Sequence, residues 1–118
     1  PYLVDGVYNA NGERSLTAQP TKLMQAVSET TAGRVRDVLV GVVNNGTGTD
    51  AAIDGVQVAG KTGTAEKADG NDSWFVGMAP ADDPRVVVAL IIEDGEEGVG
   101  AQKAQNVLKT ALEVQGLL

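Results

Sequence analysis

Three strand-like runs in the second half of the sequence are joined by turns of only a few residues. The runs are residues 56–66, 73–80 and 85–93, and the turn-forming residues Asp69-Gly70 and Asp82-Asp83-Pro84 lie between them. Such short connections join antiparallel strands, whereas parallel strands need a longer crossover. The spacing therefore predicts an antiparallel three-stranded meander. Its last strand, Val86–Ile92, is almost continuously apolar and β-branched, which predicts that both of its faces are covered.

Two helices are expected to flank this meander. The first is Ser28–Val43, with Ser28, Thr30 and Thr31 as candidate N-caps and an Asn-Asn-Gly end, and the second is Gln102–Gln115. Residues 1–20 contain an Asn-Gly turn signal and predict a short hairpin or an irregular loop. The predicted fold class is thus α+β, an antiparallel meander with flanking helices. The apolar stripes of the two helices are Val35, Val38, Leu39, Val42 and Val43, and Ala101, Ala104, Val107, Leu108, Ala111 and Leu112.

Composition excludes several classes of function. The net charge is −7 and the nine basic residues are scattered, which argues against a nucleic-acid partner. The sequence has no cysteine and no histidine, so thiolate chemistry, the commonest general base and the commonest metal ligand are absent. No cofactor and no metal are predicted. At 118 residues the chain is one domain or part of one.

The first of the three runs carries an unusual series of side chains: Lys61, Thr62, Gly63 and Thr64 follow one another. In an extended backbone alternate side chains share a face, so the two threonines point together and the lysine points to the opposite face. Gly63 has no side chain, and a ligand or another backbone can approach closely there. A cation, two aligned hydroxyls and an approachable strand suit an anionic, peptide-like ligand.

A different interpretation of the same stretch is a phosphate-binding loop. Residues 55–62 match the pattern G-x-x-x-x-G-K-[ST] letter for letter. That pattern needs a strand before it and a helix that begins at the lysine. Here the preceding residues are loop-like, the four middle residues are strand-like, and Gly63 and Asp69-Gly70 follow. Nucleotide binding is therefore disfavoured.

The tripeptide Lys61-Thr62-Gly63 is also one of three signature motifs of the penicillin-binding proteins and serine β-lactamases. Its context is residues 59–66, then Trp74–Pro80, then an apolar strand and a terminal helix. With the segments 28–32 and 45–49, this order resembles the C-terminal part of a class B penicillin-binding protein transpeptidase domain. The resemblance covers about residues 1–117 and implies a partial β-lactamase/transpeptidase-like fold. It assigns residues 1–118 to one domain, whose remainder is expected upstream in a longer protein.

The other two signature motifs are absent. Neither Ser-x-x-Lys, which carries the nucleophile, nor Ser-x-Asn occurs at the three serines, Ser15, Ser28 and Ser73. Both motifs are expected in the upstream part. The isolated chain is therefore predicted to be inactive, although it belongs to an acyl-transferring enzyme. The alternative is a non-catalytic interaction domain that keeps the strand motif as a relic.

The resemblance implies a role for each residue of the motif. Lys61 supplies positive charge and helps to move protons, the hydroxyls of Thr62 and Thr64 hold a carboxylate, and Gly63 lets the substrate lie along the strand. The backbone N–H of Thr64 is one oxyanion-hole donor. The implied partners are peptidoglycan stem peptides, β-lactams and the upstream part of the same domain. The implied location is extracytoplasmic, with the longer protein anchored by an N-terminal transmembrane helix.

Overall fold

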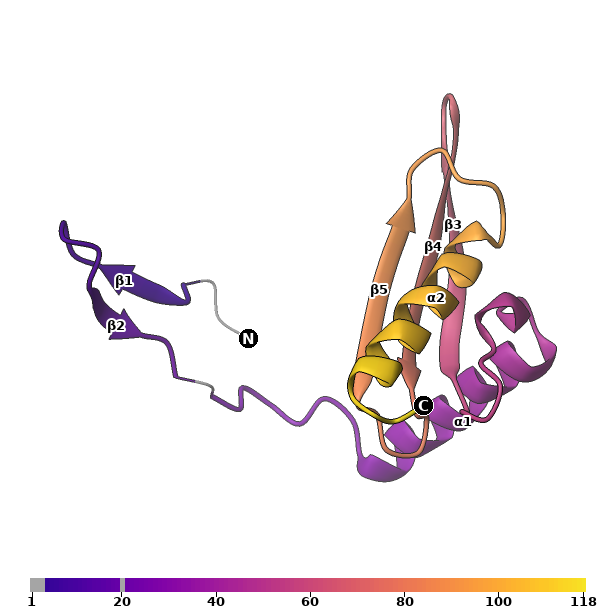
Figure 1. The fold of residues 1–118 in the computed structure, drawn as a ribbon, viewed down its shortest axis with the longest axis horizontal. Helices are drawn as coiled ribbons and strands as arrows, with labels where there is room; N and C mark the ends of the chain where they lie inside the picture. The colour runs from indigo at the N-terminus through magenta and orange to yellow at the C-terminus, as the bar shows by residue number, and fades with distance from the viewer. Residues whose placement is uncertain (1–3, 20) are drawn as a thin grey trace.

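The sheet of the protein is the predicted three-stranded meander. The computed structural model describes residues 4–19 and 21–118. Strands β3 (Ala59–Lys67), β4 (Gly70–Ala79) and β5 (Val86–Ile92) are antiparallel and lie in the order β3-β4-β5, so that β3 and β5 are edge strands (Figure 1). Because β3 runs through Lys61 and Thr62, the helix that a phosphate-binding loop requires at these residues does not form, and the predicted strand is confirmed.

Helix α1 (Glu29–Asn45) begins after Ser28, the first of the three candidate N-caps. The Ser28 hydroxyl accepts a hydrogen bond from the Thr31 N–H at 3.1 Å, and Glu29 lies in the first turn, where the helix dipole favours an acidic side chain. The helix ends at Gly46, whose N–H donates to the Val42 carbonyl. A loop and a short 3₁₀ helix, η1 (Thr49–Ala51), then lead to β3.

Helix α2 (Val99–Val114) packs on β4 and β5, as predicted, but begins three residues earlier than the sequence pattern indicated. Its first turn lies against the sheet because the Gly100 N–H donates to the buried Ser73 hydroxyl at 3.1 Å. A Cβ at Gly100 would lie 3.1 Å from the Trp74 carbonyl carbon, so glycine permits this close approach.

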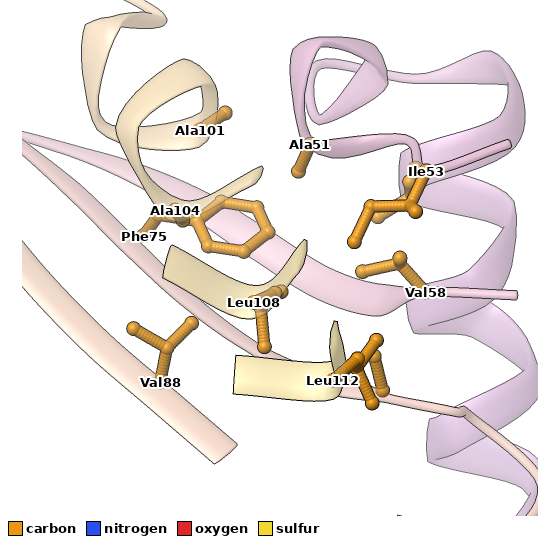
Figure 2. Close-up of a cluster of buried hydrophobic side chains, with 11 residues drawn as sticks. Ala51, Ile53, Val58, Phe75, Val88, Ala101, Ala104, Leu108 and Leu112 are labelled. Carbon is orange, nitrogen blue, oxygen red and sulfur yellow. The ribbon is translucent and has the colours of Figure 1, made fainter. Parts of the chain in front are cut away.

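The hydrophobic core lies between α2 and one face of the sheet (Figure 2). Phe75 is fully buried at its centre, beside Ala104 and Leu108 of α2, and Val58 and Ile53 from the segment before β3 close one side. Helix α1 contributes Val43. The complete core cluster is Val43, Ala51, Ile53, Val58, Phe75, Ala79, Val88, Ala101, Ala104, Leu108 and Leu112.

The opposite face of the sheet is uncovered by the described residues. We call it the open face and define it by Trp74, Val76, Val87 and Ile91, which are between 40% and 70% exposed. The prediction that β5 is covered on both faces is therefore wrong for this chain, since α2 covers only the face that carries Val88. In the same way, only Val43 of the predicted α1 stripe is buried, while Val35 and Val38 are exposed.

The N-terminal hairpin stands apart from the sheet (Figure 1). Strands β1 (Gly6–Tyr8) and β2 (Arg14–Thr17) pair antiparallel, and the Asn9 side-chain oxygen accepts hydrogen bonds from the N–H groups of Asn11 and Glu13 in the turn. The hairpin alternative of the prediction is thus confirmed for the described residues. Residues 1–3 and 20, which were part of the same prediction, lie outside them.

Two facing glycines make room for the central aromatic ring. Gly60 of β3 pairs with Gly77 of β4, and a Cβ at either position would overlap the ring of Phe75. We expect Gly60→Ala and Gly77→Ala each to destabilise the folded protein by about 1–3 kcal/mol, because a methyl group must displace a fully buried ring. Chemical denaturation of the longer protein that contains this chain, called the full-length protein below, measures the free energy of unfolding. Gly33→Ala, on α1 with open space around it, is the control and should not be destabilising. Equal stability of all three variants would contradict the expectation.

Candidate active site

The four predicted site residues lie in the middle of β3, which is an edge strand. Lys61 pairs with Val76, Thr62 with Phe75, Gly63 with Trp74 and Thr64 with Ser73. The edge of β3 that does not face β4 is called the open edge here. The site is therefore a strand with one side held by the sheet and one side available to a ligand.

The hairpin between β3 and β4 determines which backbone groups lie at the open edge. Lys67 and Gly70 flank a two-residue turn and form a hydrogen-bonded pair. In an antiparallel ladder such pairs recur at every second residue, and their N–H and C=O groups point to the neighbouring strand, here β4. In β3 these pairs involve the odd-numbered residues. The backbone N–H and C=O groups of Thr62 and Thr64 consequently point to the open edge. Their arrangement can pair with an extended peptide or donate to an oxyanion.

Lys61 bends around this edge. Its side chain starts on the open face, but its Nζ donates to the Thr62 carbonyl oxygen at 2.8 Å and to Thr62 Oγ1 at 3.2 Å. The contact with the carbonyl supports the assignment of that group to the open edge. The lysine thus brings its positive charge to the same edge as the threonine hydroxyl.

The side chains of β3 alternate as predicted. Thr62 and Thr64 share a face with Phe75 and Ser73, and Gly63 lies on the opposite face beside Trp74. A Cβ at Gly63 would be 3.3 Å from the Trp74 Cβ, so the glycine also lets the indole lie close to the strand. Trp74 itself is 41% exposed on the open face.

A cluster of ion pairs lies at the C-terminal end of β3. Beyond the last β4–β5 pair, Ser73 with Ile92, β3 and β4 continue as a two-stranded ribbon. Lys67 Nζ lies 2.6 Å from Asp72 Oδ1 and 2.8 Å from Asp94 Oδ1, and the Asp94 N–H donates to Asp72 at 3.1 Å. The partners of Lys67 are carboxylates that fix the ribbon to the connection between β5 and α2.

These contacts favour the charged forms of Lys67 and Asp72. Hydrogen bonds to Asp72 and Asp94 raise the pKa of Lys67, and hydrogen bonds from Lys67 and from the Asp94 N–H lower the pKa of Asp72. The stabilisation through Asp72 is present above its ordinary pKa and is lost as the pH falls through its lowered pKa. The stabilisation through Lys67 is lost only as the pH rises through its raised pKa.

Thr47 also lies at the motif, although no pattern in the sequence indicates it as a site residue. It lies in the loop after α1, fifteen residues before Thr62, yet their Oγ1 atoms are 2.7 Å apart. No spacing rule connects a loop threonine to a strand threonine at that separation. The only signal was its position in the segment 45–49 that carried part of the family resemblance.

Comparison with known proteins gives the same family for most of the chain. The model of the penicillin binding protein transpeptidase domain matches residues 1–113. The peptidoglycan D,D-transpeptidase PbpA of Mycolicibacterium smegmatis is 37% identical over 108 residues, which cover 86% of this chain and 21% of that protein. Stage V sporulation protein D of Bacillus subtilis is 42% identical over 82 residues, 64% of this chain and 13% of that protein.

Solved structures agree in fold. The D,D-transpeptidase domain of a peptidoglycan glycosyltransferase from Eggerthella lenta is 84% identical, with a TM-score of 0.82, over 100% of this chain and 28% of that one. Penicillin-binding protein A from M. tuberculosis, solved as an imipenem acyl-enzyme complex, is 32% identical, with a TM-score of 0.71, over 95% of this chain and 26% of that one. The chain thus spans less than a third of either structure. It belongs to the penicillin-binding protein transpeptidase domain family.

Proposed function

We propose that this chain forms the strand side of a peptidoglycan D,D-transpeptidase site. The observation that carries the proposal is the series Lys61 to Thr64 on an edge strand, with the backbone groups of Thr62 and Thr64 at the open edge. A stem peptide, or a β-lactam in its place, binds along this edge. Relatives of the chain support the reaction class, since one is named a peptidoglycan D,D-transpeptidase and another was solved as an acyl-enzyme with imipenem.

In the proposed reaction a serine attacks the carbonyl carbon of a D-Ala-D-Ala-type bond, the terminal D-alanine leaves, and an amine then takes the acyl group. The Thr64 N–H donates to the oxyanion that develops on the attacked carbonyl. Lys61 stabilises negative charge and assists proton transfer. The hydroxyls of Thr62 and Thr64 hold the terminal carboxylate, and Gly63 leaves space beside the strand.

The remaining machinery belongs to the upstream part of the same domain in this proposal. That part supplies the nucleophile motif Ser-x-x-Lys and the motif Ser-x-Asn, neither of which occurs here. It also covers the open face, whose Val87 is 70% exposed. Apolar faces of this kind usually contact another part of a protein.

The proposed location follows from the substrate. A peptidoglycan stem peptide is processed outside the cytoplasmic membrane, so the longer protein acts there and is held by an N-terminal transmembrane helix. Within the described ranges, 4–19 and 21–118, none of the helices has the length and apolar character needed to cross a membrane.

We expect Thr62→Val and Thr64→Val each to slow acylation by a free-acid β-lactam. Both changes are nearly isosteric, leave the backbone pairing of β3 intact and remove one hydroxyl. A hydrogen bond to a charged group contributes roughly 1.5–3 kcal/mol, which corresponds to about a tenfold to hundredfold loss of rate. The measurement is the second-order acylation rate constant of the full-length protein. An esterified β-lactam should show a smaller loss, because it lacks the carboxylate.

The control is Thr110→Val, an exposed threonine of α2, which should leave both rate constants unchanged. Equal losses for the acid and the ester would mean that the hydroxyls do not bind the carboxylate. Complete absence of acylation in the unaltered full-length protein would instead support the interaction domain with a relic motif.

A further inference from the structure

The loop that precedes β3 holds one threonine in a fixed place. The N–H groups of Gly46 and Gly48 both donate to the Val42 carbonyl, at 3.0 and 3.1 Å, and Thr47 lies between them. A Cβ at Gly46 would lie 2.9 Å from this carbonyl oxygen, so the loop is closely packed on the last turn of α1. Thr47 is therefore anchored on both sides by its neighbours' backbone.

The anchored hydroxyl belongs to a chain of three polar groups. Thr47 Oγ1 is 2.7 Å from Thr62 Oγ1, which in turn is 3.2 Å from Lys61 Nζ. An ammonium group only donates, so Thr62 Oγ1 accepts from Lys61. The single hydrogen of the Thr62 hydroxyl can then point either to Thr47 or to a ligand.

A bound carboxylate removes this choice. Carboxylate oxygens only accept, so the Thr62 hydrogen must point to the ligand, and the short contact with Thr47 persists only if Thr47 is the donor. We propose that Thr47 is a positioning residue for carboxylate binding: its hydroxyl donates to Thr62 Oγ1 and leaves the hydrogen of Thr62 for the ligand. This inference rests on the proposed function of Thr62.

The geometry confines the effect to one of the two strand threonines. Among the residues that the structure describes, the Thr64 hydroxyl makes no hydrogen bond with another side chain, whereas Thr62 contacts both Thr47 and Lys61. Thr47 should therefore act through Thr62 and not through Thr64. This difference can be measured as non-additivity between pairs of substitutions.

The test uses the full-length protein and the acylation rate constants of one free-acid β-lactam and its ester. We expect Thr47→Val to slow acylation by the acid roughly threefold to tenfold, the range for one neutral hydrogen bond, and to leave the ester unchanged. Thr47→Ser keeps the hydroxyl and should retain the rate. Thr49→Val, two residues later at the start of η1 and exposed, is the matched control.

The double variants test whether Thr47 acts on acylation through Thr62. Thr47→Val should add almost nothing in a Thr62→Val background but should keep its full effect in a Thr64→Val background. Full additivity with Thr62→Val, or an equal loss for acid and ester, overturns the inference. If Thr62→Val is selective for the acid and Thr47→Val is silent, the inference fails while the proposed function stands. If Thr62→Val itself shows no selectivity, the carboxylate role proposed for Thr62 fails as well.

Discussion

Replacing Lys61 by alanine should slow acylation of the full-length protein by a penicillin about a hundredfold to a thousandfold. That range is typical for the loss of one preorganised electrostatic group from an acyl-transfer site. The expected loss exceeds that of the threonine variants because two things disappear together. The site loses a positive charge, and Thr62 loses the ammonium group that donates to its carbonyl and its hydroxyl. Stopped-flow measurement of the acylation rate constant provides the test.

Two other variants separate charge at the site from charge in general. Lys103→Ala removes an exposed lysine of α2 and changes the net charge by the same amount, so its rate should match the unaltered protein. Lys61→Arg keeps the charge but presents a planar group in place of a compact ammonium, and should recover only part of the rate. If Lys61→Ala behaves like Lys103→Ala, the lysine has no role in acylation and its assignment must be withdrawn.

Phe75→Ala should destabilise the protein by about 3–5 kcal/mol, the usual cost of removing a fully buried aromatic side chain. The net free energy of unfolding of a native protein is only about 5–15 kcal/mol. A loss of this size is a large part of it, so the variant should lose much of its folded population on mild heating. The ring contacts α2 on one side and lies over the pair Gly60–Gly77 on the other. Neither glycine has a side chain that could fill the space.

Thermal or denaturant unfolding of the full-length protein measures this effect, and Phe75→Leu provides a graded control. Leucine keeps most of the apolar volume, so its cost should be clearly smaller than that of alanine. Since Phe75 also pairs with Thr62, the alanine variant should acylate more slowly even where it remains folded. Unfolding midpoints that coincide for phenylalanine, leucine and alanine would contradict the placement of this ring at the centre of the core.

Local patterns were sufficient to predict the elements and the position of the motif. Turn residues between strand-like runs predicted the meander. Helix α1 starts after Ser28, one of three candidate N-caps, because its hydroxyl satisfies an N–H group of the first turn. The alternation of β3 followed from strand geometry alone. One predicted boundary was wrong for a local reason: β3 begins at Ala59 rather than Val56, since Val56 forms a bridge with Ile53, three residues earlier in the chain.

The remaining features depend on contacts between distant residues. Nothing in the sequence near Lys67 indicates Asp94 as its partner, because the two meet only when the β3–β4 ribbon folds beside the connection to α2. The pairing of Thr47 with Thr62 has the same origin. The error about β5 has another cause: a continuously apolar strand indicates that both faces become covered, but not that the same described residues cover them.

The open edge of β3 has a consequence for the behaviour of the protein at high concentration. A strand with unpaired N–H and C=O groups accepts a strand from any neighbouring molecule, and this is a common start of aggregation. The edge cannot simply be blocked with proline or a bulge if a substrate must bind there. Charged side chains are the remaining protection, and Lys61, Glu66 and Lys67 lie along this strand. Neutralising them is therefore expected to lower the solubility of the protein.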